Sequence, residues 1–76
     1  PKKADAAIAA YTKALELESG LAAAERGLGI SYAAKEQDAR AVRHYRRYLE
    51  LEPDADDADE VKAIISAYEK AKRRQR

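Results

Sequence analysis

The stretch that decides the fold is Leu28–Pro53, which reads LGISYAAKEQDARAVRHYRRYLELEP. Apolar residues recur three or four positions apart in two segments, about 22–35 and 39–51. This spacing places side chains on one face of an α-helix. Between the segments lies a short polar break, residues 35–38. Because a break this short turns the chain back on itself, the two predicted helices lie antiparallel as a helical hairpin.

Six residues of the stretch form a recognisable signature. The first helix carries a Leu-Gly pair and a tyrosine, the second carries an alanine and a tyrosine, and a proline closes the unit; these residues are Leu28, Gly29, Tyr32, Ala41, Tyr45 and Pro53. The pattern resembles the tetratricopeptide repeat, a helical hairpin of about 34 residues. The resemblance implies that the two helices cross closely where Gly29 meets Ala41, with the rings of Tyr32 and Tyr45 on either side.

Three residues depart from the family pattern. Glu25 stands where an aromatic residue is usual, Glu36 where a glycine ends the first helix, and Tyr48 where a small residue is usual. The departures imply a weaker leading turn at Glu25, a less sharply specified hairpin turn at Glu36, and extra room beside Tyr48.

The second helix of the hairpin has an echo near the start of the chain. Ala7 and Tyr11 stand 34 residues before Ala41 and Tyr45, and the same offset relates 15–18 to 49–52. The resemblance therefore implies one domain, 1–76, at the C-terminal end of a repeat array. Its expected parts are the second helix of a preceding repeat (4–19), a full repeat (22–53) and a capping helix (57–74). The predicted fold class is all-α, an α-solenoid fragment of four helices.

Several boundary and core residues can also be predicted. Gly20 is expected to end the first helix in a left-handed conformation, and Asp38 to cap the third helix through its side chain. Pro53 stops that helix. Tyr45 is expected to be the most deeply buried aromatic side chain. The last helix is expected to turn four residues inward: Val61, Ile64, Ile65 and Tyr68.

The composition argues against several classes of function. The 76 residues include 15 basic and 14 acidic side chains, one histidine and no cysteine, and the formal net charge of +1 creates no strong field toward nucleic acid or anionic membrane. One histidine without cysteine cannot make a structural zinc site, and no serine lies at a nucleophile turn. We predict a non-catalytic protein without metal or other cofactor.

No apolar run approaches the roughly 20 residues of a membrane span, and no signal peptide is visible. A soluble protein, with the cytoplasm slightly favoured, is therefore expected.

The resemblance implies a role in protein–protein interaction. In this family, the first helices of successive repeats line a concave surface that holds a partner's peptide. The corresponding positions here are Ala23, Arg26, Gly27, Ile30, Ala33 and Ala34. The same strip would suit packing against neighbouring repeats of a longer protein equally well, and the sequence does not identify a partner.

A second hypothesis is a structural fragment, or a designed sequence, that only folds or self-associates. The first helix lacks the partner helix of its own repeat, which leaves an apolar strip partly uncovered: Ala7, Ile8, Tyr11 and Ala14. Small proteins seldom leave such a patch open, so we predict a two-fold homodimer.

Nucleic-acid binding is a third and less favoured hypothesis. An arginine-rich face (Arg40, Arg43, Arg46 and Arg47) and the basic C-terminal run could contact phosphates. However, three- and four-residue steps are also the ordinary arrangement of a solvated helix side. Nucleic acid is therefore the least favoured of the three kinds of partner.

Overall fold

The computed structural model describes residues 2–75, and within this range the chain forms helices and no strand. The helices are α1 (Lys2–Leu17), α2 (Ala22–Ala34), α3 (Asp38–Leu51) and α4 (Ala58–Arg74). Pro1 and Arg76, the two ends of the predicted domain, lie outside the described residues. The predicted all-α class is confirmed.

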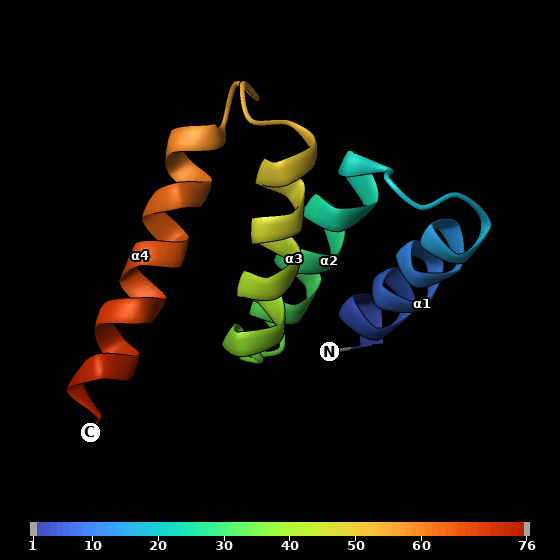
Figure 1. Cartoon of the computed structure of the whole chain (residues 1–76). Helices are drawn as coiled ribbons and strands as arrows, with labels where there is room; N and C mark the ends of the chain where they lie inside the picture. Colours follow the sequence, from blue (N-terminus) through green and yellow to red (C-terminus); the bar gives the residue numbers. More distant parts are fainter. Residues whose placement is uncertain (1, 76) are drawn as a thin grey trace.

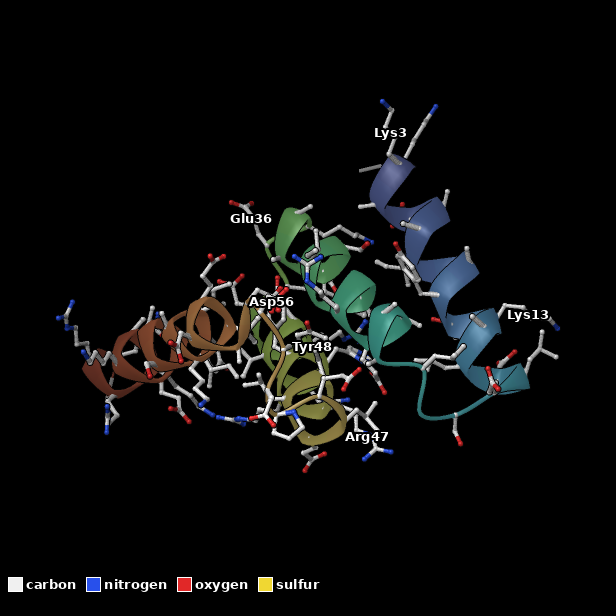
Figure 2. The ribbon with its side chains drawn as sticks, turned by 90° about the horizontal axis from the view of Figure 1, so that it is seen from above. Lys3, Lys13, Glu36, Arg47, Tyr48 and Asp56 are labelled. Atoms are coloured by element: carbon white, nitrogen blue, oxygen red, sulfur yellow. The ribbon has the colours of Figure 1, made fainter. Side chains whose placement is uncertain are left out.

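The helices pack in chain order, each against its neighbour (Figure 1). Between residues 2 and 75, no close backbone approach joins α1 to α3 or α4, or α2 to α4. Seen from above, α2 and α3 form the middle of the molecule, and α1 and α4 lie at its two ends (Figure 2). The molecule measures 38 × 31 × 18 Å along its principal axes, so the arrangement is flat. Every helix has residues exposed to solvent.

The helix ends follow from a few local conformations. Gly20, after α1, has a φ of +87°, so its predicted left-handed conformation is confirmed. Glu36, between α2 and α3, has a φ of +60°, which is unfavourable for a residue with a β-carbon. The prediction that Asp38 caps α3 is wrong. The flanking residue is Gln37, which makes no side-chain cap, and Asp38 is the first helical residue. The negative charge of Asp38 still stabilises α3, because the N-terminus of a helix carries a partial positive charge.

The centre of the core is the crossing of α2 and α3. Leu28 and Ala41 are each 2% exposed, and Tyr45, at 5%, is more buried than any other aromatic residue, as predicted. The close approach at Gly29, however, is made by the ring of Tyr45 rather than by Ala41. A β-carbon on Gly29 would lie 2.7 Å from two ring carbons of Tyr45. The glycine is therefore needed to seat a ring, because a side chain there would collide with it.

The outer helices are packed less deeply. No residue of α1 is fully buried, and its main anchor is the ring of Tyr11, which lies on Gly27 of α2. On α4 only Ala58 and Val61 are buried. Ile64, predicted to face inward, is 44% exposed. Figure 1 shows the reason: α4 diverges from α3 toward its C-terminus, so only its first turns pack closely.

The conformation of Glu36 leads to a stability prediction. Because a β-carbon is strained at this positive φ, Glu36→Gly should raise the free energy of unfolding by roughly 0.5–1 kcal/mol, measured by urea denaturation. Glu36→Ala is the matched control, since it removes the same charge but keeps the β-carbon. Equal stability of the two variants would show that the left-handed turn is not strained.

Candidate peptide-binding groove

The six predicted groove residues do not share one open surface. Five of them are exposed on α2: Ala23, Arg26, Ile30, Ala33 and Ala34. Gly27 is buried, because the ring of Tyr11 covers it. The prediction that Gly27 faces a peptide is therefore wrong. Its small size instead serves the packing of α1 on α2.

Three of the five exposed residues border hollows, and they do not border the same one. Ala33 borders an apolar hollow of about 350 Å³ between α2, α3 and α4, whereas Ala23 and Arg26 border a hollow of about 490 Å³. That second hollow also contains the acidic side chains of the loop after α3, namely Glu52, Asp54 and Asp56. Ile30 is 45% exposed and borders neither hollow.

The apolar hollow includes α4 residues that the sequence analysis did not assign to the groove. Ile64, Ala67 and Ala71 line it together with the rings of Tyr45 and Tyr68, and Asp38 is its only charged residue. The sequence contains a spacing that could have identified two of these residues. Ile64 and Ala67 stand 34 positions after Ile30 and Ala33, the same offset that relates Ala7 and Tyr11 to Ala41 and Tyr45.

The one cation among the groove residues is held by an internal partner. Arg26 Nε donates to Asp57 Oδ2 at 2.6 Å, and the hydroxyl of Tyr48 donates to Asp57 Oδ1, also at 2.6 Å. The hydrogen bonds from Tyr48 and Arg26 lower the pKa of Asp57, and the bond to Asp57 raises the pKa of Tyr48. These contacts tie the start of α4 to α2 and α3. The Tyr48 side chain is thus bonded to the residue that precedes α4.

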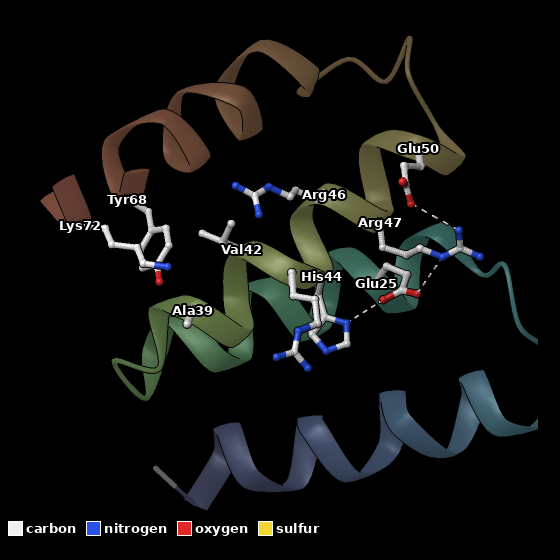
Figure 3. A pocket seen from close by; sticks show the side chains of 10 residues that line it. Glu25, Ala39, Val42, His44, Arg46, Arg47, Glu50, Tyr68 and Lys72 are labelled. Carbon is white, nitrogen blue, oxygen red and sulfur yellow. Dashed lines mark hydrogen bonds and ion pairs between the residues drawn. The ribbon is translucent and has the colours of Figure 1, made fainter. Parts of the chain in front are cut away.

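A second polar cluster joins α2 to α3 (Figure 3). The carboxylate of Glu25, a residue only 8% exposed, lies 2.7 Å from His44 Nδ1 and 3.8 Å from Arg47 Nε. The imidazole of His44 stacks on the ring of Tyr32, with centroids 5.6 Å apart. Among the described residues no buried side-chain polar atom lacks a partner. Glu25 is therefore held in the core by bonded contacts with α3, which the sequence analysis did not predict.

Comparison with known proteins finds no match to this chain among protein-family models, curated proteins or solved structures. The tetratricopeptide resemblance thus stays a prediction. In residues 2–75, no helix is long and apolar enough to cross a membrane. The same residues hold no group of three or more histidine, cysteine, aspartate or glutamate side chains placed to bind a metal ion.

The contacts of Asp57 predict a pH dependence of stability. Because its pKa in the folded state lies below the ordinary value of 3.8, its stabilising effect is complete above that pH and is lost as the pH falls through the lower folded-state pKa. Urea unfolding should therefore show the parent losing more stability than Asp57→Asn between neutral pH and about pH 2. All other carboxylates are common to both proteins. If the free energies of unfolding of the parent and of Asp57→Asn fell equally with pH, the Asp57 contacts would be absent in solution.

Proposed function

We propose that this chain is a non-catalytic module for protein–protein interaction, built of helical hairpins of the tetratricopeptide type. In this proposal α2 and α3 form the full repeat, α1 is the second helix of a preceding repeat, and α4 is the capping helix. The signature residues support it: Leu28 and Ala41 are among the most buried side chains, and Gly29 receives an aromatic ring of the next helix. Pro53 follows soon after α3 ends at Leu51.

The observation that carries the interaction role is a pair of exposed isoleucines. Ile30 on α2 and Ile64 on α4 are 45% and 44% exposed, and they stand at the repeat offset from one another. Single exposed apolar residues are common on protein surfaces and need no explanation. Here the exposure recurs on two helices, and Ile64 borders an apolar hollow. This arrangement supports a groove for a peptide with apolar side chains.

The alternative is that the strip packs against other parts of a longer protein, or that the chain only folds. Neither of these two alternatives gives the isolated chain an affinity for free peptides, whereas the proposal does. Peptide selection against the chain therefore separates the hypotheses.

We expect selection from a random peptide display library to return apolar peptides that bind this groove. Ile64→Asp should weaken their binding at least tenfold, because Ile64 borders the apolar hollow and burying an isoleucine contributes roughly 1.5–3 kcal/mol. Leu17→Asp is the matched control, since Leu17 is 77% exposed on the distant α1. The affinities would be measured by isothermal titration calorimetry. A library that yields no binder, or equal losses in the two variants, would refute the groove.

A second candidate function, self-association, is favoured by the exposure of α1. The predicted self-association residues Ala7, Ile8, Tyr11 and Ala14 are all half-buried, and among residues 2–75 only α2 packs on α1. Tyr11 already covers Gly27, so its ring is partly used within the chain. Ala7 and Ala14 of the same strip are therefore chosen as the contacts for a second copy.

Sedimentation equilibrium at low micromolar concentration tests this second candidate. The proposal expects the mass of a dimer for the parent and of a monomer for Ala7→Glu/Ala14→Glu, because charges would enter an apolar contact. Circular dichroism would verify that the variant keeps its helices. A monomeric parent protein would exclude self-association.

A further inference from the structure

A third hollow lies between α3 and α4 and is lined by cations from both helices (Figure 3). Its volume is about 560 Å³. Arg43, Arg46 and Arg47 line it from α3, and Lys72 lines it from α4. Figure 3 shows Lys72 beside Tyr68 on α4, across from Ala39 at the start of α3. We call this hollow the cationic wedge. It is distinct from the apolar hollow, although Val42 and Tyr68 border both.

The four cations of the cationic wedge differ in whether an internal carboxylate holds them. Arg46 pairs with Glu69 on α4 at 2.5 Å. Arg47 contacts Glu25 at 3.8 Å and Glu50 at 3.4 Å. Within residues 2–75, Arg43 and Lys72 form no ion pair and no side-chain hydrogen bond. The wedge therefore offers one open cation on each of its walls.

We propose that the cationic wedge binds an acidic segment of a partner protein, with carboxylates on Arg43 and Lys72 and an apolar side chain against Ala39 and Tyr68. Guanidinium and ammonium groups both bind carboxylates through charge-assisted hydrogen bonds. A groove between two helices is also a common binding site for a peptide that has both apolar and charged side chains. This surface does not depend on the groove formed by α2.

The carboxylates of the wedge favour a protein segment over nucleic acid. Glu25 and Glu50 line the same hollow, and Glu69 holds one of its arginines. A nucleic acid carries a phosphate at every nucleotide, so its backbone would meet these carboxylates as well as the cations. A peptide can instead place its carboxylates only where the open cations lie. The chain's net charge of +1 likewise gives no general attraction for a polyanion.

Fluorescence anisotropy with a labelled peptide of alternating glutamate and leucine tests the proposal. The parent chain should bind this peptide at low salt, and the affinity should fall as salt screens the charges. The double variant Arg43→Glu/Lys72→Glu should weaken binding about tenfold or more, because it turns two attractions into repulsions. The neutral variant Arg43→Gln/Lys72→Gln should show a smaller loss. It keeps the test valid if charge reversal disturbs the helices.

The matched control is Lys2→Glu/Lys13→Glu, which makes the same change in net charge on exposed residues of α1. It should leave the affinity nearly unchanged. Equal losses in the wedge and control variants would mean that only the overall charge matters, and would overturn the proposal. So would a parent chain that does not bind the acidic peptide. Binding of single-stranded oligothymidine through Arg43 and Lys72, without binding of the peptide, would assign the wedge to nucleic acid instead.

Discussion

The ring of Tyr45 on α3 lies on the backbone of Gly29 on α2, and this contact sets how closely the two central helices approach. An aromatic side chain buries a large apolar area, but only if the facing helix leaves room for the ring. Gly29 leaves that room by having no side chain, although glycine lowers helix stability by about 1 kcal/mol relative to alanine. The burial of Leu28 and Ala41 beside the crossing shows that the surrounding side chains fit the same spacing.

The other contacts between the central helices depend on the register set at this crossing. Glu25 reaches His44 only because α2 and α3 lie antiparallel at this distance. At the same end of the hairpin, Arg26, the neighbour of Glu25, and Tyr48 converge on Asp57 and fix the start of α4. The C-terminal half of α4 has no comparable polar contact to α2 and diverges from α3. That divergence leaves room for both the apolar hollow and the cationic wedge.

Much of the fold could be predicted because it depends on local patterns. The three- and four-residue spacing of apolar residues predicted helices, Gly20 predicted a left-handed helix end, and the signature predicted the burial of Tyr45. The misses share a different cause. Periodicity shows which side of a helix is apolar but not how far the helix tilts, so Ile64 was placed inward although α4 diverges there.

The polar contacts of the candidate site were also beyond the sequence analysis. The convergence of Arg26, Tyr48 and Asp57 depends on the path of the loop after α3, which no local pattern specifies. Gly27 was assigned to the groove by its position in the predicted repeat, but it lies beneath Tyr11. Which face of α2 the first helix would cover depends on packing between helices. By contrast, the exposed positions on α4 could have been found by extending the repeat offset from Ile30.

The most direct test of this account is a double-mutant cycle between Gly29 and Tyr45, measured by urea unfolding. In the parent protein, Gly29→Ala should lower the free energy of unfolding by roughly 1–3 kcal/mol, because the new methyl group collides with the ring. In a Tyr45→Val background the ring is gone, so the same substitution should be neutral or stabilising through the better helix propensity of alanine. An equal loss of stability in both backgrounds would contradict the central role of this contact.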